Sequence, residues 1–108
     1  GAAETEPVTL RLGDLVLDLK ARRVTRAGQA ISLSSREFAV LEYLLRHRGE
    51  AVTRTRLSEH VWDQHFDSMT NVIDVTLYHL REKVDRGFAT PLIHTIRGVG
   101  YVAKEAAT

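Results

Sequence analysis

The sequence contains no cysteine, which excludes disulfides, thiolate metal sites and thiol nucleophiles. This absence fits a protein of the reducing cytoplasm. No apolar run approaches the length needed to cross a bilayer, and the N-terminal stretch GAAETEP lacks the basic and then apolar pattern of a signal peptide. The net charge is only +1. The chain is therefore no polycation, and any binding of nucleic acid must depend on where its charges are placed.

The length and composition predict a single globular domain. A chain of 108 residues can bury one hydrophobic core but is too short for two. Its 44% hydrophobic and 27% charged residues are typical of a soluble fold. We expect a leader or linker over residues 1–7, a folded domain over residues 8–104 and a short tail over residues 105–108.

The N-terminal third has the period of β-strands. Apolar and polar residues alternate over the runs 8–12, 15–19, 22–26 and 29–33, and turn residues such as Gly13-Asp14 and Ala27-Gly28 separate them. Four such runs predict an antiparallel meander. One face of this sheet should be apolar, so it must cover another part of the fold.

Two helices are predicted next. Ser34 followed by Glu37 forms a capping box, and an apolar face follows until Gly49, which is placed to end the helix. Thr53 is a plausible N-cap for a shorter helix that runs to about Trp62, with Leu57 and Val61 facing inward. We expect Val52 to be a short extended link and residues 63–69 to form a polar loop.

The stretch from Ser68 to Arg86 predicts the helix around which the chain is organised. Ile73, Leu77, Leu80 and Val84 recur at helical spacing and form an apolar stripe. The opposite face carries a mixture of donors, acceptors and aromatic groups that suits a DNA groove better than a core. Taken alone, the pattern also fits an ordinary amphipathic surface helix. The residues on the face opposite the apolar stripe are Asn71, Val75, Tyr78, His79 and Glu82.

A β-hairpin is predicted after this helix. Residues 92–96 and 101–103 are β-prone, and the loop between them contains Gly98 and Gly100, which permit positive φ. Arg97 stands at the slim tip. An arginine there is usually solvated, but a hairpin that follows a helix-turn-helix is a wing, and its arginine can enter a narrow minor groove.

The chain offers no constellation for catalysis. Five histidines are present, but no pair has metal-ligand spacing on one helix face, and His60 and His65 lie five apart across a predicted helix end. The Gly98 and Gly100 pair precedes a strand rather than a helix, so it is no phosphate loop. We predict no enzyme activity, no metal and no cofactor. A winged-helix module for protein–protein interaction stays as the alternative to DNA binding, and salt dependence separates the two.

Several motifs together resemble the effector domain of OmpR/PhoB-type response regulators. They occur in the expected order over residues 8–104, which is nearly the whole chain. The stretch from Trp62 to Asn71 is further similar to the heavy-metal-responsive branch, the CusR/CopR-like regulators. The motifs are Leu33-Ser34-x-x-Glu37-Phe38, Val61-Trp62, Asn71-Val72-Ile73-Asp74-Val75, Leu80-Arg81-x-Lys83 and Ile96-Arg97-Gly98-Val99-Gly100-Tyr101.

The resemblance implies an α+β fold, a winged helix-turn-helix with an N-terminal four-stranded antiparallel sheet, three helices and a C-terminal hairpin wing. It implies a cytoplasmic bacterial regulator whose N-terminal receiver domain, absent from this chain, is the target of a sensor histidine kinase. Double-stranded DNA with tandem half-sites is the implied partner, with helix 69–86 in the major groove and wing 92–103 in the minor groove. Loop 63–69 would be a contact for RNA polymerase.

The resemblance also implies roles for individual residues. Positions that match contacts to bases and phosphates hold Val75, Thr76, Tyr78, His79 and Arg81. Positions that match backbone contacts hold Trp62, Asn71 and Thr95, and Arg97 matches the minor-groove arginine.

Alternatives stay open at four places on or near these positions. Many members of the family carry two basic residues where this chain has Tyr78-His79, so guanine readout from these positions is in doubt. Tyr78 could instead donate to a phosphate or pack on a thymine methyl group, and His79 could hydrogen-bond a base edge. We expect Asp74 to orient Arg81 or another basic neighbour, and Glu82 to be solvated or paired. Trp62 alone would more often be a core residue than a contact.

Overall fold

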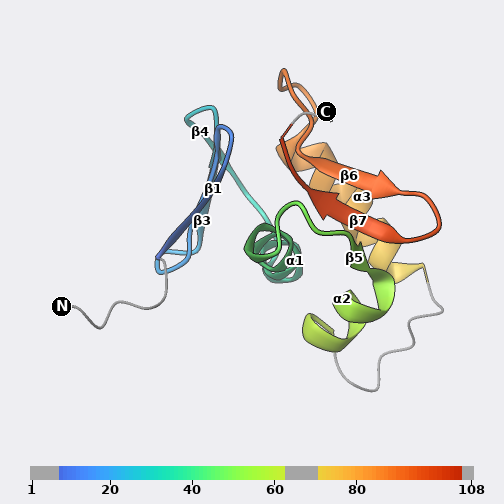
Figure 1. Ribbon diagram of the computed structural model, residues 1–108. Helices are drawn as coiled ribbons and strands as arrows, with labels where there is room; N and C mark the ends of the chain where they lie inside the picture. The colour runs from blue at the N-terminus through green and yellow to red at the C-terminus, as the bar shows by residue number, and fades with distance from the viewer. Residues whose placement is uncertain (1–7, 63–70, 106–108) are drawn as a thin grey trace.

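The computed structural model describes residues 8–62 and 71–105 of the chain, and its elements follow the predicted order (Figure 1). A four-stranded sheet leads into α1, a short strand and α2, and then into α3 and a hairpin. The strands are β1 (Thr9–Leu12), β2 (Leu15–Asp18), β3 (Arg23–Arg26), β4 (Gln29–Ile31), β5 (Val52–Thr53), β6 (Ile93–Ile96) and β7 (Gly100–Ala103). The helices are α1 (Ser35–Arg46), α2 (Arg54–His60) and α3 (Val72–Val84). The predicted fold class is confirmed.

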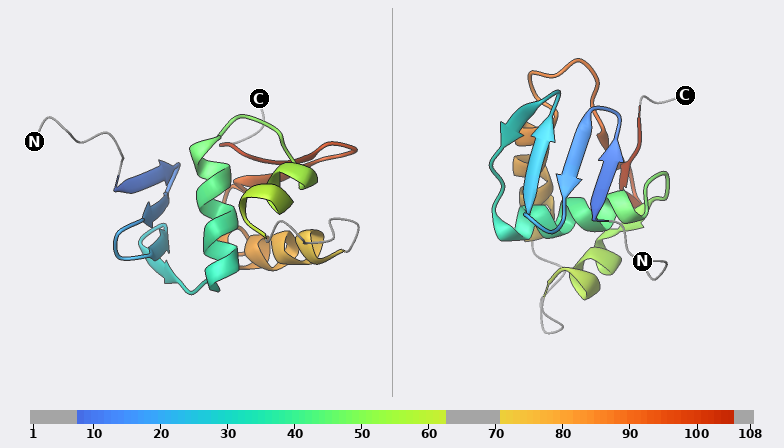
Figure 2. Two further views of the ribbon diagram at one scale, coloured as in Figure 1. Left: turned by 90° about the horizontal axis from the view of Figure 1, so that it is seen from below. Right: turned by 90° about the vertical axis from the view of Figure 1, so that its left-hand side faces the viewer.

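The N-terminal sheet is the predicted meander. Its strands pair antiparallel in the order β1-β2-β3-β4, with Leu12 opposite Leu15 and Leu17 opposite Val24. These four residues are buried and face α1, which lies between the sheet and the rest of the domain (Figure 2). The sheet thus covers one side of α1, as its one apolar face requires.

Helix α1 begins as its sequence predicts. The Ser34 hydroxyl accepts a hydrogen bond from the Glu37 backbone N–H at 3.1 Å, and the Glu37 carboxylate accepts one from the Ser34 N–H at 2.9 Å. Leu41 and Leu44 are fully buried at the centre of its apolar face. The helix ends at Arg46, and Gly49 follows with a φ of +83°.

The second helix is shorter than predicted. Thr53 caps it by accepting from the Arg56 N–H at 3.1 Å, but α2 ends at His60 rather than Trp62. Val61 is the C-cap residue and is only half-buried, so Leu57 alone is the deeply buried inward residue. Val52, predicted as an isolated link, pairs with Tyr101 and makes β5 the third strand of a sheet ordered β5-β7-β6.

Helix α3 buries the predicted apolar stripe, and Ile73, Leu77, Leu80 and Val84 are all at most 1% exposed. Its described part begins at Val72 and ends at Val84, so the predicted C-terminal bound at residue 86 is two residues too long. The reason is Asp85, whose carboxylate accepts from the N–H groups of Leu92 and Ile93, both at 3.0 Å. These bonds direct the chain toward β6. The predicted start at residues 68–69 lies outside the described residues.

The wing strands pair antiparallel, and Gly98 in the turn has the predicted positive φ of +76°. Gly100 is a glycine for a different reason, because its φ is not positive. A Cβ atom built on Gly100 would lie 2.0 Å from the Val52 carbonyl oxygen. The residue therefore permits close approach of β7 to β5.

Arg26 is a buried charged residue in a sheet for which the sequence analysis predicted only an apolar covering face. Its side chain is 1% exposed and joins the sheet to the end of α3. The guanidinium donates to the Val84 carbonyl at 2.6 Å and to the Asp85 carboxylate at 3.0 Å. It also binds Asp14 and the Thr90 carbonyl. A cation at this position also suits the negative end of the α3 dipole.

Over residues 8–62 and 71–105, no helix is long and apolar enough to span a membrane.

Candidate nucleic-acid interface

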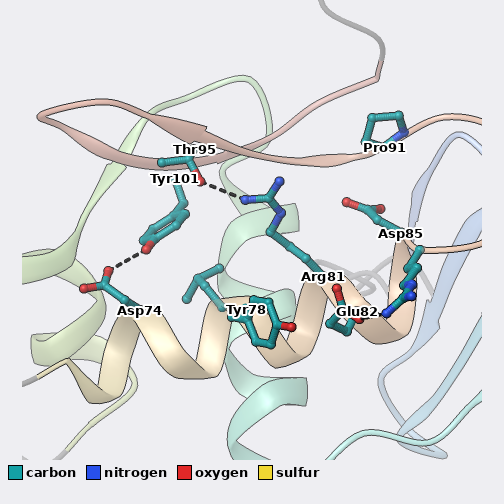
Figure 3. Close-up of a pocket in the computed structure, with 10 residues that line it drawn as sticks. Asp74, Tyr78, Arg81, Glu82, Asp85, Pro91, Thr95 and Tyr101 are labelled. Atoms are coloured by element: carbon teal, nitrogen blue, oxygen red, sulfur yellow. Dashed lines mark hydrogen bonds and ion pairs between the residues drawn. The ribbon is translucent and has the colours of Figure 1, made fainter.

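Helix α3 and the wing lie side by side, and side chains from both point into the space between them (Figure 3). A groove of about 490 Å³ runs between them. It is lined by α3 side chains between Asp74 and Glu82, by Asp85 and Arg86 just after the helix, and by Pro91, Thr95 and Tyr101. The hairpin lies alongside α3 in the perpendicular view as well (Figure 2). The helix and the wing therefore line one groove together.

A hydrogen bond joins two of the residues that the sequence singled out. Arg81 on α3 donates through Nη1 to the Thr95 hydroxyl on β6 at 2.9 Å, and both side chains are exposed (Figure 3). An arginine has five N–H donors. The bond to Thr95 thus positions the guanidinium at the mouth of the groove and leaves donors for a further acceptor.

A second link between helix and wing passes through Asp74. Its carboxylate accepts a hydrogen bond from the Tyr101 hydroxyl at 2.5 Å and lies 3.3 Å from Arg54 Nε. The basic neighbour of Asp74 is thus Arg54 and not Arg81. Burial, and then the bond to Asp74, raise the pKa of Tyr101 to about 12. The Tyr101 phenol therefore stays protonated at neutral pH and continues to donate its hydrogen bond to Asp74.

The remaining α3 positions differ in what they present to solvent. Asn71, at the N-cap, and His79 are exposed, and the side chains of Val75 and Tyr78 are 41% and 59% exposed. The rings of Tyr78 and His79 meet edge to face at 5.4 Å. Thr76 is half-buried, and its hydroxyl donates to the Val72 carbonyl at 2.8 Å. Its proton is therefore used within the helix.

Of the sequence-predicted residues, Tyr78, Arg81 and Thr95 line the groove and the others do not. Two of these others, Trp62 and Arg97, also lie outside α3. Trp62 follows α2, is half-buried against the core, and has the Arg36 guanidinium 5.0 Å above its ring. Arg97 stands exposed in the turn of the wing, and none of the described residues pairs with it. Trp62 is therefore packed partly against the core and partly exposed at its edge, the two placements between which the sequence did not decide.

Two cations at and just after the C-terminal end of α3 are bound to carboxylates. Lys83 lies 2.7 Å from Glu37 of α1, and Arg86 lies 2.7 Å from Glu82 one turn earlier. Glu82 is thus paired, as one of the two sequence interpretations had it. Burial opposes ionisation of Glu37, but the hydrogen bonds from Lys83 and Ser34 outweigh it and hold the pKa of this carboxyl below its usual value.

Sequence reasoning missed two arginines that support this surface: Arg54, which pairs with Asp74, and Arg26, which is buried and bonds to the end of α3. Arg54 lies twenty positions before Asp74 in the chain, and Arg26 is 59 positions before Asp85. No helix or strand period connects partners so far apart. Within the described ranges, no group of three or more His, Cys, Asp or Glu residues could hold a metal ion; His65 lies outside those ranges.

Comparisons with known proteins assign the chain to a family. The family described as "Transcriptional regulatory protein, C terminal" matches residues 28–103. The transcriptional regulatory protein CusR of Escherichia coli K12 is 48% identical over 102 residues, which are 94% of this chain and 45% of CusR. The similarity to CusR agrees with the predicted CusR/CopR-like branch.

Solved structures agree in fold. The DNA-binding domain of CpxR from E. coli has a TM-score of 0.80 at 34% identity, and the match covers 94% of this chain and all of that one. The Klebsiella pneumoniae RstA DNA-binding domain, solved in complex with the RstA box, has a TM-score of 0.79 at 30% identity over 89% of this chain and 96% of that one.

The chain spans less than half the length of CusR. The matching family is one of transcriptional regulators rather than enzymes, which agrees with the prediction from the sequence. The chain belongs to the family of C-terminal domains of transcriptional regulatory proteins, the DNA-binding effector domains of OmpR/PhoB-type response regulators.

Proposed function

We propose that the chain binds double-stranded DNA sequence-specifically as the effector domain of a bacterial two-component transcriptional regulator. The observation that carries the proposal is the exposed face of α3 fixed beside a hairpin with an arginine in its turn, with Arg81 and Thr95 bonded across the groove. A helix of this kind enters the major groove. An arginine on a slim wing suits a narrow minor groove, where the negative potential is concentrated.

The proposed roles divide between positioning and base readout. Phosphate contacts set the register of a protein on duplex DNA, whereas contacts to base edges select the sequence. Arg81 suits a phosphate because its bond to Thr95 fixes the side chain and leaves further N–H donors. The phosphate contacts are assigned to Trp62, Asn71, Arg81 and Thr95, base readout to Val75, Thr76, Tyr78 and His79, and minor-groove contact to Arg97.

The proposal extends to the longer protein of which this chain would be a part, and the length of the relatives supports it. Because CusR is more than twice as long as the match, an N-terminal receiver domain controlled by a sensor histidine kinase is part of the proposal. Residues 1–7 would be the linker to it, residues 8–104 the folded domain and residues 105–108 a tail. Two copies would occupy tandem half-sites about one helical turn apart. Loop 63–69, which lies outside the described residues, is the proposed contact for RNA polymerase, and the cytoplasm is the proposed location.

Selection of bound sites from a random duplex pool, repeated at two salt concentrations, tests the function. We expect a repeated motif to be enriched and affinity to fall steeply with salt, because each phosphate contact releases counterions. If no sequence motif is enriched and the affinity does not change with salt concentration, the proposal is refuted. That result would favour the alternative, a winged-helix module for protein–protein interaction.

A further inference from the structure

The N-terminal half of α3 exposes large apolar side chains on the face opposite the core. Of the five exposed large hydrophobic residues among those described, three lie within seven positions here. Val72 is 42% exposed, Val75 is 41% exposed and Tyr78 is 59% exposed. Residues three apart on a helix are surface neighbours, so these side chains form one strip. Exposed apolar residues gathered in this way indicate a contact surface rather than chance.

The same half of the helix lacks the groups that read guanine. Arginine and lysine are the side chains that donate to guanine O6 and N7, and the stretch from Val72 to Leu80 contains neither. The cations further along lie beyond this half of the helix. Lys83 is bound to Glu37, and Arg81, bonded to Thr95, is the group assigned above to a phosphate.

Thr76 is not a donor to bases in this arrangement, because its hydroxyl proton goes to the Val72 carbonyl. A recognition helix presents mainly its N-terminal residues to base edges. The surface that meets the bases is therefore predominantly apolar.

The only apolar group on the major-groove edge of a base pair is the C5-methyl group of thymine. Resting on the function proposed above, we infer that Val72 and Val75 contact thymine methyl groups, and that the half-site is selected by the position of these methyls rather than by guanines. Burial of one methyl group in such a contact changes affinity about fourfold. The target class is thus duplex DNA with thymine at the one or two positions that face this pair.

Replacing thymine by uracil removes the methyl group and leaves every hydrogen-bonding group in place. The experiment uses the duplex half-site obtained by selection and replaces each thymine in turn by deoxyuridine, with dissociation constants measured by fluorescence anisotropy. We expect about fourfold weaker binding at one or two adjacent positions of the half-site and no change at flanking thymines.

The variant Val72→Ala/Val75→Ala should bind thymine and uracil duplexes equally at those positions. Both residues are exposed and alanine is the better helix former, so the fold should be retained. The number of phosphate contacts is unchanged, so the dependence of affinity on salt should be as in the parent protein. Val8→Ala is the matched control, because Val8 is 63% exposed but precedes β1 on the far side of α1. This control should keep the full difference between thymine and uracil.

The outcomes separate this inference from the proposed function. Sequence-specific binding with no loss at any uracil would overturn the methyl contact and leave the proposed function standing. A uracil effect that persists undiminished in the double variant would overturn the assignment to Val72 and Val75. A protein that selects no sequence at all would overturn both.

Discussion

Arg26→Ala is the substitution from which we expect the largest loss of stability for a single charged residue. The side chain is 1% exposed and bonds to Asp14, Asp85 and the carbonyls of Val84 and Thr90. Its removal leaves the Asp85 carboxylate, which is 9% exposed, without its cation and leaves two carbonyls without this donor. Breaking a buried ion pair by removing one partner costs about 3–5 kcal/mol. The total stability of such a domain is about 5–15 kcal/mol.

Urea denaturation followed by the fluorescence of the single tryptophan measures this loss. Arg86→Ala is the matched control. The Arg86 side chain is 76% exposed and pairs with Glu82 one turn away, so its loss should leave the denaturation midpoint nearly unchanged. Asp14→Ala should also cost less than Arg26→Ala, because Asp14 is 49% exposed and can be solvated by water. A free energy of unfolding for Arg26→Ala within about 1 kcal/mol of the parent protein would refute the reasoning.

Four further predictions follow from single contacts. The pKa of Glu37 is lowered from 4.5, so the stabilisation that this carboxylate contributes is complete above pH 4.5 and is lost as pH falls through the lower folded value. In Glu37→Gln, the free energy of unfolding measured by urea denaturation should therefore depend less on pH in the acid range. The pKa of Tyr101 is raised from 10.0 to about 12, so the stabilisation that its protonated phenol contributes is complete below pH 10.0 and is lost as pH rises toward 12. An absorbance titration should show one tyrosine ionising at about pH 12, and this ionisation should be absent from Tyr101→Phe. Gly100→Ala should lower the free energy of unfolding by about 1–3 kcal/mol, because the new methyl group meets rigid backbone; an unchanged denaturation midpoint would contradict this. In binding assays, Arg97→Ala should weaken affinity most at A·T-rich flanks, while His79→Ala should alter base preference; an equal loss on every sequence for both variants would disprove this division of roles.

Local patterns were sufficient for most of the architecture. The capping box at Ser34 and Glu37 and the stripe from Ile73 to Val84 depend on neighbours within a few turns, so periodicity predicts them. The helix ends were less accurate. Asp85 ends α3 through bonds to residues seven and eight positions ahead, and the helical pattern contains no sign of them.

The candidate interface was predicted in its members but not in its connections. The sequence placed Arg81, Thr95 and Arg97 on a helix and a hairpin, and resemblance to a family suggested their roles. It predicted a basic neighbour for Asp74 without identifying Arg54, and it gave no indication that Arg81 bonds to Thr95 or that Tyr101 bonds to Asp74. These contacts fix the angle between helix and wing, and they form only when β6 and β7 pack alongside α3.

By itself, the sequence determined which segments become strands and helices, which face of each is apolar, and which side chains α3 presents to solvent. Each of these follows from residue type at short spacing. Tertiary structure alone decided the burial of Arg26, the pairing of Val52 with Tyr101 and the close approach at Gly100. The physical reason is that these features join residues dozens of positions apart. Their energies depend on desolvation and on contact geometry, and both exist only once the layers have packed.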